Sequence, residues 1–207
     1  MLIAAAITGA VAAGIPPGRV FMSPLPEYLR IIRENERRWR ASAWGFAVST
    51  VLLAVGLLIA IGVSGSRLDA ETGTSPSRQL GFAAIAVFVV VAPCWLGTLA
   101  LRLDLTVAAA RGTVDQAWYD AIGKWSTSLY GFFMVGGHAA VALLGASLIG
   151  SPLVPAWAAW TTTAVGAVQA ASFLIGWPRP FGMRGVLELP VIVPLLPLFV
   201  AIPLAFA

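Results

Sequence analysis

The chain has 207 residues, of which 59% are hydrophobic and only 11% are charged. An average soluble domain is about 25% charged, so this composition excludes an ordinary soluble globule and a disordered chain, and one cysteine excludes a disulfide scaffold. The excess of 13 basic over 9 acidic residues lies in short segments between apolar runs, which indicates membrane orientation and not nucleic-acid binding. The predicted fold class is all-α, a polytopic transmembrane helical bundle forming one membrane domain over residues 1–207.

Residues 1–16 form a short apolar segment that Pro16 and Pro17 terminate. A secretory signal peptide needs a basic region before its apolar stretch, and no Lys or Arg precedes Arg19. We therefore expect a retained, marginal first span. The bundle then has six spans, or five with a shallow N-terminal segment.

The segment from Pro26 to Arg40 is predicted to be one helix that runs directly into the next span. Proline suits the first turn of a helix, and three oppositely charged pairs have the i,i+4 spacing that supports a helical surface: Arg30/Glu34, Glu34/Arg38 and Glu36/Arg40. Two roles stay open for this helix. It is either an interfacial helix held by anionic lipid, with Tyr28, Leu29, Ile32 and Trp39 in the interface, or a docking surface for a cytoplasmic partner.

Charge-free runs predict the remaining spans at about 41–63, 79–101, 125–150, 156–177 and 189–207. Each of the first two has 23 residues, enough to cross a hydrocarbon core of about 30 Å. The run from Trp125 to Pro178 is too long for one helix, and prolines in the segment 151–155 indicate a hairpin. Four prolines in the last span should bend it.

A short cytoplasmic helical stalk is predicted between the spans 79–101 and 125–150. The first helix should continue to Arg111 and close at Gly112, since glycine favours the position after a helix end. Thr113 and Gln116 then fit a capping box that starts the next helix. On that helix, the carboxylate of Asp120 should pair with Lys124.

The basic residues alternate between the two sides of the predicted bundle. Six arginines lie in 15–40, three cations in 102–124 and two in 178–188, whereas the intervening loops hold two and none. Because cytoplasmic loops are enriched in Lys and Arg, the first three segments are predicted to be cytoplasmic. The preference for Arg over Lys, with abundant Ala, suggests a GC-rich bacterial genome, and the predicted location is therefore the bacterial plasma (inner) membrane.

Three carboxylates fall at the predicted cytoplasmic ends of different spans: Asp104, Asp120 and Glu188. Arg102, Tyr119 and Arg184 fall at the same level. If these helix ends converge, a carboxyl group with a perturbed pKa could exchange protons with a lipophilic substrate. The three acids are therefore candidate catalytic residues.

His138 is the only histidine and lies near the predicted bilayer centre, where ionisable residues suggest function. It is a fourth catalytic candidate, as a proton relay, with a packing role bonded to Gln169 as the alternative. Four side chains at this depth are candidate substrate contacts: Tyr130, Met134, Gln169 and Cys94. One His and one Cys cannot supply a usual zinc site, so no metal and no cofactor is predicted.

Three functions stay open. The first is a non-catalytic or accessory subunit of a membrane assembly; the second is a cofactor-independent intramembrane cyclase or isomerase acting on a lipophilic substrate; the third is a small transporter. An enzyme predicts a cavity that holds the candidate acids, and a transporter predicts a polar path to both faces. The expected partners are the lipid bilayer, a second membrane protein or a second copy of the chain, and a lipophilic small molecule; nucleic acid is not expected.

Overall fold

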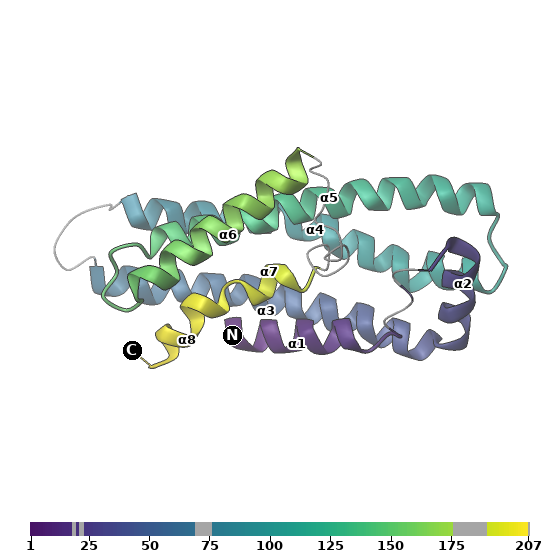
Figure 1. Ribbon diagram of the computed structural model, residues 1–207, viewed down its shortest axis with the longest axis horizontal. Coiled ribbons are helices and arrows are strands. Elements are labelled where there is room, and N and C mark those ends of the chain that lie inside the picture. Colours follow the sequence, from purple (N-terminus) through teal and green to yellow (C-terminus); the bar gives the residue numbers. More distant parts are fainter. Residues whose placement is uncertain (18–19, 21–22, 69–75, 176–189, 207) are drawn as a thin grey trace.

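The computed structural model describes residues 1–17, 20, 23–68, 76–175 and 190–206, and all regular structure within them is helical. The helices are α1 (Leu2–Gly14), α2 (Leu25–Glu34), α3 (Glu36–Leu68), α4 (Pro76–Ala110), α5 (Gln116–Ser147), α6 (Ala156–Leu174), α7 (Ile192–Leu195) and α8 (Leu198–Phe206). Figure 1 shows an elongated bundle in which α3, α4 and α5 run along the long axis. The predicted all-α helical bundle is confirmed.

Within the described ranges, three helices are long and apolar enough to cross a membrane: α3 over Glu36–Gly62, α4 and α5. Their 33, 35 and 32 residues correspond to rods of about 50 Å. A hydrocarbon core is only about 30 Å thick, so these helices extend beyond it. The predicted spans 41–63, 79–101 and 125–150 fall largely within them.

The other predicted spans are represented by shorter helices. Helix α6 starts at Ala156, as predicted for the span 156–177, and carries no charge, but with 19 residues it is much shorter than α3–α5 and is not among the three helices that are long and apolar enough to cross a membrane. Helices α1, α7 and α8 have 13, 4 and 9 residues, where spans 1–16 and 189–207 are predicted. The prolines of the last segment split it into two pieces, because each removes a backbone donor.

Helix α1 packs closely along the part of α3 that follows Trp39. The hydroxyls of Ser42 and Ser49 donate hydrogen bonds of 2.7 Å to the carbonyls of Ala12 and Ala5. Gly45 leaves no room for a side chain, since an added Cβ atom would lie 2.8 Å from the Cβ atom of Ala12. Small residues that allow such close approach, and hydroxyls that bond across it, are typical of membrane helix pairs.

Helix α8 contacts α6 and α1. Leu2 of α1 and Leu204 of α8 line one cavity of about 190 Å³ together with Gly56 and Ala60 of α3. Helices α1, α3 and α8 therefore meet around this cavity.

Helices α5 and α6 pack at glycine contacts. An added Cβ atom at Gly145 would lie 2.6 Å from the backbone nitrogen of Thr163, and one at Gly166 would lie 2.8 Å from the backbone nitrogen of Ala142. Backbone atoms cannot move aside as a flexible side chain can. The close approach of α5 and α6 therefore depends on the absence of side chains at Gly145 and Gly166.

At one end of the bundle, the chain turns sharply between α2 and α3, so the predicted continuous helix from Pro26 to Arg40 is wrong. Asn35 adopts a non-helical conformation (φ −125°, ψ 31°) and its side-chain amide donates a 3.0 Å hydrogen bond to the carbonyl of Ile31. The turn lets Ile31 and Ile32 pack against Val107 and Ala110 of α4. The apolar face of α2 is thus buried against protein, where the sequence suggests the bilayer interface.

The stalk between α4 and α5 forms with a different start from the one predicted. Gly112 closes α4 with φ +73°, a conformation that favours glycine, and the Thr113 backbone N–H bonds the carbonyl of Ala108, as in a Schellman motif. The N-cap of α5 is Asp115, whose carboxylate accepts hydrogen bonds from two backbone N–H groups. Thr113 instead bonds back to Ala108, so the predicted capping box is wrong.

A bidentate ion pair joins the tip of the stalk to the start of α3. The guanidinium of Arg111 donates to both carboxylate oxygens of Glu36 at 2.7–3.0 Å, and Arg40 donates to the same carboxylate at 2.9 Å. The hydrogen bond from Arg40, together with that from Arg111, holds the pKa of Glu36 below its ordinary value. The predicted Glu36/Arg40 and Arg30/Glu34 pairs both form.

The glycine contact between α5 and α6 predicts a position-specific effect of one methyl group. Gly145→Ala should lower the free energy of unfolding by about 1–3 kcal/mol, since the helices must separate. Gly131→Ala on the same helix has nothing within 4 Å of the added atom and should be neutral or stabilising by up to about 1 kcal/mol. Thermal unfolding in detergent compares the two, and equal melting temperatures would contradict the packing.

Candidate functional site

The stalk end of the bundle contains a cleft of about 520 Å³ between α2, α4 and α5, called here the stalk cleft. Its volume lies in the range of about 300–1,000 Å³ that small-molecule sites occupy. Polar and apolar side chains both line it: Leu25, Tyr28, Leu101, Arg102, Leu105, Thr106, Tyr119, Asp120, Ile122, Lys124, Ser126 and Thr127, with Gly123. Such a mixed lining suits a molecule with a polar and an apolar part.

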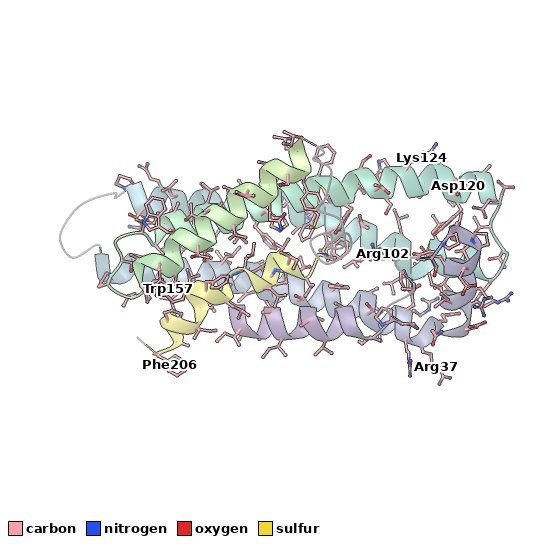
Figure 2. All side chains as sticks on the ribbon, in the orientation of Figure 1. Arg37, Arg102, Asp120, Lys124, Trp157 and Phe206 are labelled. Atoms are coloured by element: carbon pink, nitrogen blue, oxygen red, sulfur yellow. The ribbon has the colours of Figure 1, made fainter. Side chains whose placement is uncertain are left out.

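The cleft lies where the charge-free segments of α4 and α5 end. Leu101 is the last residue before Arg102 on α4, and Ser126 and Thr127 follow Lys124 on α5. Figure 2 places Arg102, Asp120 and Lys124 on these two helices, toward the end of the bundle that carries α2. The antiparallel pairing of α4 with α5 brings the two boundaries to one level.

Arg102 is held against two indole rings. Its guanidinium carbon lies 5.2 Å from the ring centroid of Trp95 and 5.9 Å from that of Trp39, distances at which a cation is attracted to an aromatic face. The indole N–H of Trp39 also donates a 2.9 Å hydrogen bond to the backbone carbonyl of Arg102. The side chain is partly buried, and no carboxylate of a described residue forms an ion pair with it.

Tyr28 brings α2 to the cleft. Its ring meets that of Trp39 edge to face at 5.8 Å, and its hydroxyl is bonded with Tyr119 of α5 and Thr106 of α4. Burial raises the pKa of the Tyr28 phenol well above its usual range, although the positive charge of Arg102 acts in the opposite direction. The phenol is therefore a neutral group at any physiological pH.

The three predicted boundary carboxylates do not meet at one site. Asp120 lines the cleft, where its carboxylate accepts a 2.9 Å hydrogen bond from the Gln116 amide and makes no ion pair with Lys124, contrary to the predicted pairing. Asp104 is not among the lining residues; its side chain is 88% exposed and lies 3.7 Å from Arg40. Glu188 and Arg184 lie outside the described residues.

His138 of α5 is fully buried and packs against α6. Its Nδ1 atom donates a 2.7 Å hydrogen bond to the carbonyl of Met134, and its ring stacks on Phe173 at 5.8 Å. Its Nε2 atom has no hydrogen-bond partner among the described residues, so the predicted bond between His138 and Gln169 is absent. Gln169 itself is 9% exposed on α6.

The other candidate substrate contacts lie in the helical core. Tyr130 packs on Trp95 at 5.5 Å, Met134 is fully buried, and Cys94 is a partly buried free thiol packed against the same core. The stalk cleft and the cavity between α1 and α8 are lined by other residues. The side chains predicted to form one midplane layer are thus separated from the cavity that holds Asp120.

Sequence reasoning assigned Tyr28 to the bilayer interface and passed over Thr106, Ser126 and Thr127. A signal was available for two of them, because Thr106 stands four residues after Arg102 and Thr127 stands three residues after Lys124, spacings that place side chains on one helix face. Nothing in the sequence indicated that α2 would turn back at Asn35 and bring Tyr28 to α4. Within the described residues, no group of three or more His, Cys, Asp or Glu side chains is placed to hold a metal ion.

No family model, curated protein or solved structure matches the chain significantly. Function is therefore inferred from the geometry and chemistry of the chain's own residues.

The burial of His138 predicts that shape matters more than polarity at this position. His138→Ala should lower the free energy of unfolding by about 2 kcal/mol or more, because it leaves a cavity in the core. His138→Leu fills most of the space and removes the unpaired nitrogen, so its stability should stay within about 1 kcal/mol of the unmodified chain. Thermal unfolding in detergent measures both. A loss in His138→Leu as large as that in His138→Ala would show that the imidazole itself is required.

Proposed function

We propose that the chain is a multi-pass membrane protein that binds a lipophilic small molecule in the stalk cleft and does not itself catalyse a reaction. The observation that carries this proposal is the position of a mixed polar and apolar cavity of about 520 Å³ at the boundary between the charge-free and charged parts of α4 and α5. A molecule whose polar end stays near water can enter such a cleft directly from the bilayer. Ligand binding of this kind fits an accessory subunit of a membrane assembly.

A non-catalytic role agrees best with the placement of the titratable side chains. Of the candidate acids in the described residues, only Asp120 lines the cleft, while Asp104 is exposed elsewhere and His138 lies in the core. General acid–base catalysis needs a positioned group within hydrogen-bond reach of the reacting atom. Asp120 alone offers one such group, already bonded to Gln116.

The presence of Asp120 in the cleft supports the alternative of a cofactor-independent enzyme for a lipophilic substrate. The two functions differ in what the carboxylate does. In a binding protein, Asp120→Asn leaves ligand binding nearly unchanged, whereas in an enzyme it abolishes turnover of the bound molecule. A small transporter has less support, because the polar side chains of the cleft all lie at one end of the bundle.

The bilayer arrangement is part of the same proposal. We infer that α3, α4, α5 and α6 cross a bacterial inner membrane and that α1 and α7–α8 pack against one another beside them. The excess of basic residues in 15–40 and 102–124 supports a cytoplasmic position for the stalk and α2. The hairpin at residues 148–155 then lies on the outer side.

Cysteine labelling tests this orientation. In a Cys94→Ala background, Arg37→Cys and Arg111→Cys should react with a membrane-impermeant maleimide in inside-out vesicles only, because both lie at the stalk end. Ser151→Cys in the hairpin should react in right-side-out vesicles only. Labelling of the first two positions from opposite sides would overturn both the orientation and the membrane placement.

A bulky substitution in the cleft tests ligand binding. Ser126→Trp fills part of the cleft and should reduce the binding of lipophilic ligands, such as single-chain lipids, by about 10-fold or more, since a steric block removes contacts that the bound state needs. Ser128→Trp, two residues away but outside the lining, is the matched control. Binding to the full chain in detergent is measured by native mass spectrometry. Equal binding by all three proteins would exclude the cleft as a ligand site.

A further inference from the structure

The stalk cleft presents cationic groups that no described carboxylate neutralises. Arg102 and Lys124 both line it and form no ion pair with a described residue. Asp120 also lines it, but one of its carboxylate oxygens is engaged by the Gln116 amide. The lining therefore carries an excess of positive charge at the edge of an apolar bundle, where a charge without a counter-ion is costly.

The fixed position of Arg102 makes it the centre of this charge. Contacts with Trp39 and Trp95 hold the guanidinium on aromatic faces, and its N–H groups donate no hydrogen bond to a described residue. A planar guanidinium with several fixed donors matches the oxygens of a phosphate or carboxylate. Lys124, exposed at the side of the cleft on α5, adds a flexible point charge.

The number of neighbouring donors favours phosphate over carboxylate. Besides the two cations, the hydroxyl-bearing residues Tyr119 and Ser126 line the same cleft, while the hydroxyl of Tyr28 is engaged with Tyr119 and Thr106. A carboxylate has two oxygens to accept hydrogen bonds, whereas a phosphomonoester has three terminal oxygens and up to two charges. Apolar side chains of Leu25, Leu101, Leu105 and Ile122 complete the lining and suit an acyl or isoprenoid chain attached to the phosphate.

We propose that the stalk cleft binds a phosphomonoester amphiphile, with Arg102 as the main phosphate-binding residue and Lys124 as a second cation. This inference rests on the proposed ligand-binding function and names the ligand class. The same phosphate chemistry could be supplied by a lipid headgroup or by free inorganic phosphate, so the experiment includes both.

The test compares the binding of lysophosphatidic acid, lysophosphatidylcholine and inorganic phosphate to the full chain in neutral detergent, at about 0.15 M salt to screen exposed charges. Lysophosphatidic acid should bind at least about 10-fold more tightly than the other two, because only it offers both an unshielded phosphate and a chain. Native mass spectrometry or displacement of a fluorescent lysophosphatidic acid measures the affinities.

Two cleft variants and one control assign the effect to residues. Arg102→Gln should weaken lysophosphatidic acid binding by about 10-fold or more, the scale of a lost charge-assisted hydrogen bond. Lys124→Gln removes an exposed cation without disturbing the core and should weaken it about 3-fold or more, which keeps the test valid if Arg102→Gln fails to fold. Arg37→Gln is the control, because Arg37 lies at the edge of the view in Figure 2 opposite to Lys124. This variant should change the affinity for lysophosphatidic acid less than 2-fold.

The outcomes separate this inference from the proposed function. Equal affinity for the two lysolipids, with no effect of Arg102→Gln or Lys124→Gln but a loss in Ser126→Trp, would overturn the phosphate inference and leave the lipophilic cleft. Binding of inorganic phosphate as tight as that of the lysolipid would support the phosphate site and overturn a lipophilic ligand. An equal loss of lysophosphatidic acid affinity in Arg37→Gln and Lys124→Gln would show that only general charge attraction is measured, and it would overturn the proposed site.

Discussion

The contact of Trp39 with Arg102 organises the stalk end of the molecule. The indole N–H of Trp39 donates a hydrogen bond to the backbone carbonyl of Arg102 on α4, and the guanidinium of Arg102 lies over the indole ring. The edge-to-face contact of the same indole with Tyr28 holds α2 in place. One side chain on α3 therefore fixes the relative positions of three helices at the level where the apolar segments end. The stalk cleft exists because α2 is held there. Trp95 continues the same aromatic layer inward, stacking on Phe133 at 5.4 Å.

Much of the bundle could be predicted from the sequence because hydrocarbon imposes simple demands. A long segment without charge must become a helix that satisfies its own backbone, and the charge-free runs accordingly fall in α3, α4, α5 and α6. Gly112 was predictable for a similar local reason, since a helix end in the left-handed region favours glycine. Chain position alone also predicts that Arg102, Tyr119 and Asp120 lie at one boundary, and all three line the cleft.

The remaining features depend on contacts between distant segments. The turn at Asn35 brings Ile31 and Ile32 onto α4, and i,i+4 charge spacing carries no information about that long-range contact. His138 and Gln169 share a depth, but depth does not determine which way a side chain faces around its helix. Apolar length alone also does not indicate how the chain's first and last segments pack, where α1 and α8 contact one another.

The glycine contacts at Gly145 and Gly166 join α6 to the part of α5 that lies away from the cleft. The part of α5 that lines the cleft, Tyr119–Thr127, has α4 and α2 as its partners around the cavity. The wall formed by α4 is clamped through the pairing of Arg111 with Glu36. The third wall of the cleft, α2, is a short helix of ten residues. The width of the entrance is consequently governed by the shortest of the three helices that enclose it.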